Sequence, residues 1–135
     1  MTHTCSSEGS VDHAGYAAIV DGVIRTYPWM DFEIVSYRHG TLTIAGSIDP
    51  TVEPDLTITF GGVRCIVASV EWRTDTKRQV LRLIPEEDAA QYNHGYVLEI
   101  GTGVFQFTPE NLAGPCIIGA RTIKLERHKA WSATS

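Results

Sequence analysis

Apolar and polar residues alternate along much of the chain, and a period of two is typical of β-strands that bury one face. The alternation is strictest in 55–60, where threonines separate leucine, isoleucine and phenylalanine. Two glycines follow, and another apolar segment, 63–67, begins after them. If the glycines form a two-residue turn, Ile58 lies opposite Cys65 and the apolar residues of both segments share one face. The sequence therefore predicts a hairpin over 55–67.

Pairing residues outward from a two-residue turn predicts a second hairpin nearer the N-terminus. His39 and Gly40 separate a strand-like segment, 31–38, from the alternating segment 41–48. The pairs that follow from a two-residue turn are Tyr37 with Leu42 and Val35 with Ile44.

Further strands are expected in the second half of the chain. A turn at 74–77 places Val70 opposite Leu81, and a turn at Thr102 and Gly103 joins 96–100 to 104–107. The segment 116–125 is expected to be the last strand.

Two segments have helical patterns. Apolar residues recur at spacings of three and four within 11–27, Ser10 or Asp12 is available as the N-cap, and Pro28 ends the helix. A short helix is expected in 85–92, where proline is followed by three acidic residues that complement the helix dipole.

These elements predict one α+β domain over 11–127, flanked by a flexible N-terminal lead, 1–10, and a flexible tail, 128–135. The N-terminal helix packs on a curved, mainly antiparallel meander sheet of about seven strands. A chain of 135 residues is long enough to bury a core without a disulfide or a metal.

The composition is that of an ordinary soluble protein, with 43% hydrophobic and 20% charged residues. The first ten residues hold neither a basic start nor an apolar stretch, which predicts a cytoplasmic location without a membrane anchor. The formal charge of -5 is uneven, because residues 1–60 hold eight acidic and two basic side chains. This distribution disfavours nucleic acid as a partner and suits a basic protein, although charge also serves solubility.

The sequence defines no catalytic constellation, no metal-ligand spacing and no cofactor motif, so no cofactor is expected. Buried reduced thiols are expected at Cys65 and Cys116. For Trp29 and Trp72, core packing competes with a role as an exposed anchor. The candidate partner-binding residues are Asp31, Glu33, Asp49, Glu53, Asp55 and Trp72.

Two motifs carry a family resemblance: Tyr-Pro-Trp-Met-Asp-Phe-Glu-Ile-Val at 27–35 and Leu-Thr-Ile-Thr-Phe at 56–60. With the threonine-rich strand between them and a final hairpin, the pattern over 27–125 resembles small β-rich bacterial families. These are uncharacterised or predicted immunity proteins of the immunity protein 50 type. Those families often carry an aromatic residue and a His-Asp pair before the first strand. Trp29 and Asp31 stand near that place here, without a histidine.

The resemblance implies a non-enzymatic protein that binds and blocks a bacterial toxin domain. The leading hypothesis is therefore a cytoplasmic protein-interaction domain of this kind. The alternative is a β-barrel-like domain that binds a small molecule or sugar, with hydrolase or isomerase activity, through Asp31, Glu33 and His39. A homo-oligomer that pairs an exposed strand edge with its copy is also open.

Overall fold

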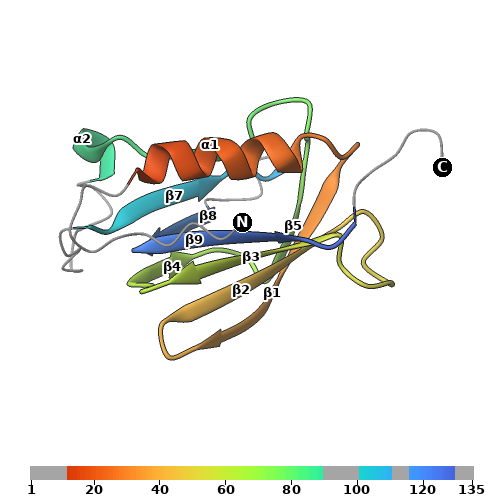
Figure 1. The fold of residues 1–135 in the computed structure, drawn as a ribbon, viewed down its shortest axis with the longest axis horizontal. Coiled ribbons are helices and arrows are strands. Elements are labelled where there is room, and N and C mark those ends of the chain that lie inside the picture. The colour runs from red at the N-terminus through yellow and green to blue at the C-terminus, as the bar shows by residue number, and fades with distance from the viewer. Residues whose placement is uncertain (1–11, 90–100, 111–115, 130–135) are drawn as a thin grey trace.

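The computed structural model describes residues 12–89, 101–110 and 116–129. In these residues, one N-terminal helix packs against two antiparallel sheets (Figure 1). The first sheet contains β1 (Met30–Arg38), β2 (Thr41–Ser47), β3 (Leu56–Gly61), β5 (Glu71–Thr74) and β9 (Thr122–Arg127). The second sheet contains β4 (Cys65–Val67), β6 (Leu81–Leu83), β7 (Gly103–Phe107) and β8 (Cys116–Ala120).

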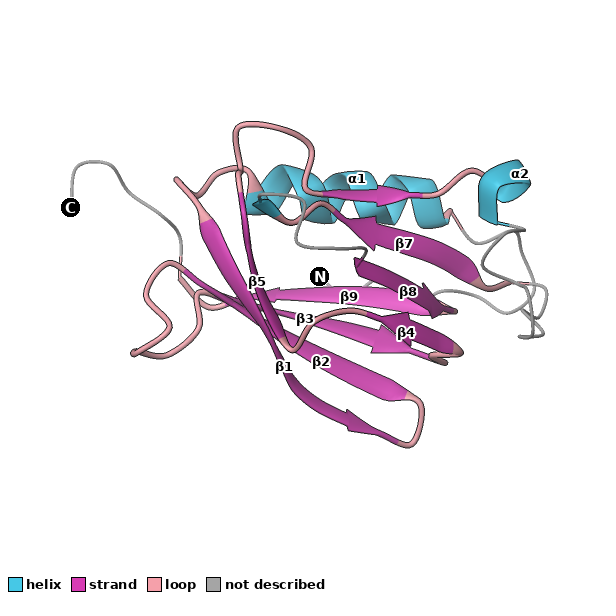
Figure 2. Cartoon of the chain, turned by 180° about the vertical axis from the view of Figure 1, so that it is seen from behind, coloured by secondary structure: helices cyan, strands magenta, loops and turns pink. Residues whose placement is uncertain are grey.

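The strand order is β5-β1-β2-β3-β9 in the five-stranded sheet and β4-β8-β7-β6 in the four-stranded sheet. The α+β class and the antiparallel pairing are confirmed. The prediction of one curved meander sheet of about seven strands is wrong, because the strands divide between two sheets that are not curled. Figure 2 shows the two sheets from behind, with β1 and β5 on the side away from β7.

Aromatic rings fill the space between the two sheets. Phe32 and Phe60 come from the five-stranded sheet, and Phe105 and Phe107 come from the four-stranded sheet. The ring centroids lie 5.2 Å apart for Phe32 and Phe107 and 5.4 Å apart for Phe60 and Phe105. These pairs are at the spacing of favourable aromatic contacts, so they bind the two sheets into one core.

The predicted Gly-Gly hairpin is wrong. β3 pairs with β2 on one edge and with β9 on the other, where Ile58 lies opposite Leu125 rather than Cys65. After Gly62, whose φ is +61°, the chain crosses to the four-stranded sheet, and Cys65 lies opposite Gly119 in β8. The alternation identified the buried face of β3 correctly. The predicted hairpin does not form because β9, from the C-terminal part of the chain, pairs with the edge of β3 that 63–67 would have occupied.

The predicted hairpin of β1 and β2 forms, with a change of register. Tyr37 lies opposite Leu42 as predicted, and His39 adopts a positive φ of 51° in the turn. Ile34, not Val35, lies opposite Ile44, because a β-bulge between Ile34 and Ser36 leaves Val35 as the extra residue.

The remaining pairing predictions also need correction. Val70 does not face Leu81, because β5 pairs with β1 and β6 pairs with β7. The predicted strand 96–100 lies outside the described residues, and β7 is already paired on both edges, with β6 and β8. The last predicted strand is two strands, since the chain passes from the four-stranded sheet to the five-stranded sheet at Arg121.

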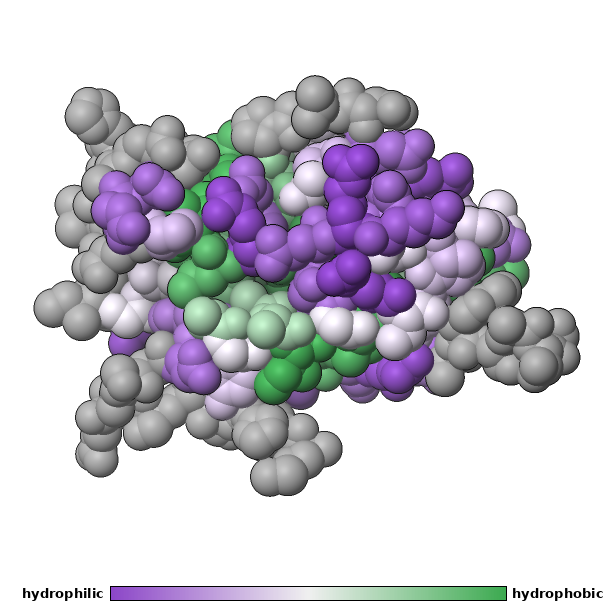
Figure 3. Space-filling model, turned by 90° about the horizontal axis from the view of Figure 1, so that it is seen from above, coloured by the Kyte–Doolittle hydropathy of each residue, from purple (hydrophilic) through white to green (hydrophobic). Residues whose placement is uncertain are grey.

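The helix α1 (His13–Ile24) begins after Asp12, one of the two predicted N-caps, whose Oδ1 accepts a hydrogen bond of 2.8 Å from Gly15 N. It ends three residues earlier than predicted and lies against β6 and β9. Its outward side exposes Ile19, and the face on that side of the molecule mixes hydrophilic and hydrophobic surface (Figure 3). The described part of the second predicted helix is α2 (Glu86–Ala89).

Two residues of the predicted tail are held in place. The carbonyl oxygen of Asp55 accepts hydrogen bonds from His128 N at 2.7 Å and from Lys129 N at 3.0 Å. The chain is therefore anchored as far as Lys129, beyond the predicted domain boundary at residue 127.

Candidate functional site

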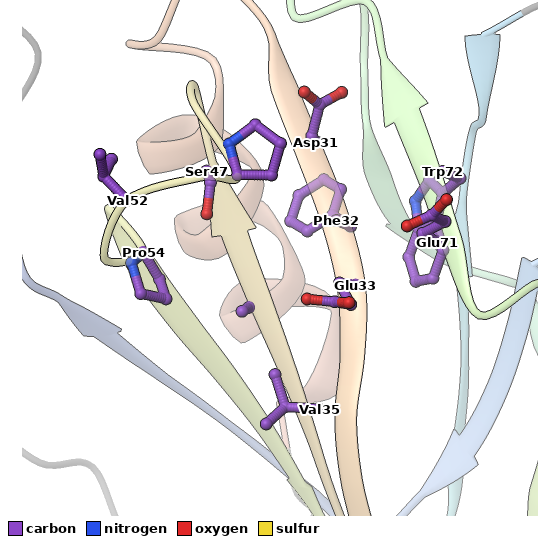
Figure 4. A pocket seen from close by; sticks show the side chains of 11 residues that line it. Asp31, Phe32, Glu33, Val35, Ser47, Val52, Pro54, Glu71 and Trp72 are labelled. Carbon is purple, nitrogen blue, oxygen red and sulfur yellow. The ribbon is translucent and has the colours of Figure 1, made fainter.

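The outer face of the five-stranded sheet carries a hollow of about 730 Å³ beside the loop 48–55. We call it the acidic hollow. Its lining residues are Asp31, Phe32, Glu33, Val35, Ala45, Ser47, Pro50, Val52, Pro54, Glu71 and Trp72. Figure 4 shows Val52 and Pro54 on one side of the hollow and Asp31, Glu33 and Glu71 on the other. One wall is therefore apolar and the other acidic.

Strand alternation explains why acidic side chains gather on this face. In β1, Met30 and Phe32 are buried in the core, so Asp31 and Glu33 point to the opposite, outer face. The same alternation in β5 buries Trp72 and leaves Glu71 on the outer face.

Glu33 and Glu71 lie directly opposite each other on neighbouring strands. Ile34 N donates a hydrogen bond of 2.8 Å to Val70 O, so Ile34 and Val70 form a hydrogen-bonded pair. Because the two kinds of pair alternate along an antiparallel ladder, Glu33 and Glu71 form a non-hydrogen-bonded pair. Side chains approach most closely at such positions, and like charges there repel. Among the described residues, no cation forms a salt bridge with either glutamate.

The next pair along the same two strands is an ion pair. Arg73 Nε lies 2.6 Å from Asp31 Oδ1, and Arg73 Nη2 lies 3.0 Å from Asp31 Oδ2. These hydrogen bonds, followed by charge attraction, raise the pKa of the Arg73 guanidinium above its usual value. Asp31 is thus neutralised within the sheet, and the uncompensated charge in the hollow belongs to Glu33 and Glu71.

The loop 48–55 is tied down at its start and its end. Asp49 Oδ1 accepts hydrogen bonds from Thr51 Oγ1 at 2.6 Å and from Thr51 N at 3.0 Å, and these bonds lower the pKa of Asp49. Lys129 Nζ donates a hydrogen bond of 3.0 Å to the carbonyl oxygen of Glu53. The carboxylate of Asp49 and the backbone of Glu53 are therefore held in place on the loop beside the hollow.

Five of the six candidate residues from the sequence lie in or beside the acidic hollow: Asp31, Glu33 and Trp72 line it, and Asp49 and Glu53 lie on the adjoining loop. Asp55 requires a correction, because it is buried and its Oδ2 accepts a hydrogen bond of 2.8 Å from Ile48 N. Its carboxylate closes the base of the loop and is not offered to a partner.

Trp72 also requires a correction. Its indole is 7% exposed and stacks on Phe32, with a centroid distance of 5.6 Å. It packs in the core and is not an exposed anchor. Trp29 is the more exposed of the two tryptophans, at 41%, and its Nε1 donates a hydrogen bond of 3.0 Å to Ile48 O.

Sequence reasoning missed Glu71 as a member of this site. The available signal was the order Glu-Trp-Arg, in which charged residues flank a tryptophan and predict a strand with one charged face. Only the pairing of β5 with β1 brings that face beside Glu33.

The alternative ligand site is not assembled. His39 lies in the turn at the far end of β1, six residues from Glu33, which is roughly 20 Å along a strand. Among the described residues, no group of three or more histidine, cysteine, aspartate or glutamate side chains could hold a metal ion.

The two described cysteines are buried, free thiols, as predicted. Burial raises the pKa of both, and that of Cys116 reaches about 12. A thiol with so high a pKa is protonated at neutral pH and is a poor nucleophile.

No family model, curated protein or solved structure matches the chain. None of the described helices is long and apolar enough to cross a membrane.

Proposed function

We propose that the protein is a non-enzymatic interaction domain that binds a basic protein partner through the acidic hollow. The observation that carries this proposal is the facing pair of Glu33 and Glu71, which no described cation neutralises. A lysine or arginine side chain from a partner would relieve their repulsion.

The two walls of the hollow suit such a side chain. Lysine and arginine have an aliphatic stem and a charged head, and they pack the stem on apolar surface while the head meets its counter-charge. Val52 and Pro54 offer the apolar surface, and the glutamates stand across from them (Figure 4).

The surrounding charge supports the same class of partner. Asp49 and Glu53 are exposed on the loop beside the hollow, and the N-terminal 60 residues hold eight acidic and two basic side chains. An extended field of one sign accelerates the encounter with a partner of the opposite sign. As the biological role we propose inhibition of a bacterial toxin, which rests on the resemblance to immunity proteins and on this preference for basic partners.

The experiment is a pull-down from the native cytoplasm with matched charge variants. The hollow variant carries Glu33→Gln, Asp49→Asn and Glu53→Gln, and the control variant carries Glu87→Gln, Asp88→Asn and Glu126→Gln. Both sets change the net charge equally and replace exposed side chains. We expect a basic protein to be captured by the wild type and the control variant, and to be lost with the hollow variant.

Other outcomes contradict the proposal. Equal capture by all three proteins, or equal loss with both variants, would mean that the hollow does not select the partner. If no protein is retained and a neutral sugar or other small molecule binds the hollow instead, the ligand-binding alternative replaces the interaction domain. The volume of about 730 Å³ is within the range of small-ligand pockets.

A further inference from the structure

We propose that the outer edge of β5 pairs with β5 of a second copy of this chain, antiparallel across a two-fold axis. In this register Glu71 of each copy lies opposite Arg73 of the other copy. This interface lies at the edge of the sheet and shares only Glu71 and Trp72 with the acidic hollow.

β5 is an edge strand, since the order of its sheet is β5-β1-β2-β3-β9 (Figure 2). Ile34 N bonds to Val70 O across the β1–β5 ladder, so the backbone groups of Val70, Trp72 and Thr74 point toward β1. The N–H and C=O groups of Glu71 and Arg73 point the opposite way. No described residue bonds to them, and they form a template for another strand.

Charged residues usually prevent an edge strand from pairing with its own copy, because identical charges meet. Here an acid and a base stand two residues apart on one strand face. An antiparallel pair centred on Trp72 therefore places a glutamate opposite an arginine twice, and each of these pairs exchanges both backbone hydrogen bonds.

Neighbouring registers lose this match. A shift toward the N-terminus sets Glu71 opposite Glu71 of the second copy. A shift toward the C-terminus sets Arg73 opposite Arg73 of the second copy and Glu71 opposite Asp75. Like charges directly opposite each other are destabilising, so the register centred on Trp72 is selected.

The second copy also brings a cation to Glu71, and this arginine is shared with Asp31 of its own chain. Within one chain, Glu71 faces Glu33 on its inner side, whereas Arg73 of the second copy would approach from the open side. Glu33, Asp49 and Glu53 would remain for a basic partner. β5 has only four residues, so the interface is small and the expected dimer is weak and dependent on concentration.

The test is analytical ultracentrifugation of the full chain from about 10 μM to about 1 mM. We expect the wild-type mass to rise from 14.9 kDa toward twice that value. Glu71→Arg and Arg73→Glu should each remain at the monomer mass, because each sets like charges opposite each other twice. An equimolar mixture of the two variants should dimerise again, because opposite charges then meet at both positions.

Glu126→Arg is the matched control, since it makes the same charge change on the same sheet but on β9, at the opposite edge. It should leave dimerisation unchanged. Circular dichroism confirms that each variant is folded. A wild type that stays monomeric at 1 mM, or a mixture of the two variants that stays monomeric, would overturn the proposal.

Disulfide trapping reads the register by proximity. In a Cys5→Ser background, Glu71→Cys and Arg73→Cys chains should cross-link with each other at least several-fold faster than either chain with itself. Equal rates would refute the register. This outcome is separate from the pull-down, in which Glu71 and Arg73 are unchanged, so either proposal can fail alone.

Discussion

Asp21 Oδ1 and Val80 N are joined by a hydrogen bond of 2.7 Å that ties the middle of α1 to the chain entering β6. The same oxygen accepts a hydrogen bond of 2.9 Å from Leu81 N. Asp21 is buried on the side of α1 that packs against the rest of the protein. Its carboxylate therefore provides the hydrogen-bond acceptor for two buried backbone N–H groups, those of Val80 and Leu81, that water does not reach.

Asp21→Ala should lower the free energy of unfolding by about 3 kcal/mol, because it leaves two buried N–H groups without an acceptor. Urea denaturation measures this change. Asp21→Asn keeps an acceptor oxygen, so its free energy of unfolding should fall clearly less than that of Asp21→Ala. A loss from Asp21→Ala no larger than the roughly 1 kcal/mol expected for removing the N-cap with Asp12→Ala would contradict this role.

Gly46→Ala should destabilise the protein by about 1–3 kcal/mol. A Cβ at Gly46 would lie 2.8 Å from Leu56 Cδ1 and 2.9 Å from Met30 Sδ, which is too close for either atom. Gly22→Ala is the matched control, because nothing lies within 4 Å of its added Cβ. In a helix this second change should stabilise by about 1 kcal/mol, so thermal melting should show shifts of opposite sign.

Glu33→Gln should stabilise the protein by about 0.5 kcal/mol at low salt, because it removes the repulsion across the ladder from Glu71. The gain should shrink as salt is added, since screening weakens interactions between exposed charges. Denaturation at two salt concentrations measures both effects. Glu126→Gln, on β9 of the same sheet, is the control, and an equal gain there would mean that only net charge matters.

Stability should fall between pH 9 and pH 12 because of Cys116. Burial raises the pKa of this thiol from 9.0 to about 12, so the folded protein retains a proton that the unfolded chain has lost. The contribution of the Cys116 thiol to the free energy of unfolding is complete below pH 9 and disappears as the pH rises through about 12. Its upper size is on the order of 4 kcal/mol.

Cys116→Ala removes this titration. The stability difference between wild type and variant should therefore shrink as the pH rises from 9 to 12, which denaturation at fixed temperature can follow. A difference that stays constant over this range would contradict the assignment.

The acidic hollow could be predicted in part. Asp31 and Glu33 are candidate residues from the sequence, and they share one strand face because they stand two residues apart. Glu71 was missed because it reaches the site only through the pairing of β5 with β1. Asp55 was assigned to the surface by its charge, whereas its carboxylate closes the loop 48–55 from inside.

Local patterns by themselves determined the α+β class, most strand positions, the N-terminal helix and the turn at His39. The tertiary structure alone decided the division into two sheets, the pairing of β3 with β9 and the bulge at Val35. The physical reason is that alternation is a property of side chains and fixes which face of a strand is buried. The edges of a strand are backbone groups that are the same in almost every residue. Which strand occupies an edge therefore depends on how distant segments, such as Phe32 and Phe107, pack into one core.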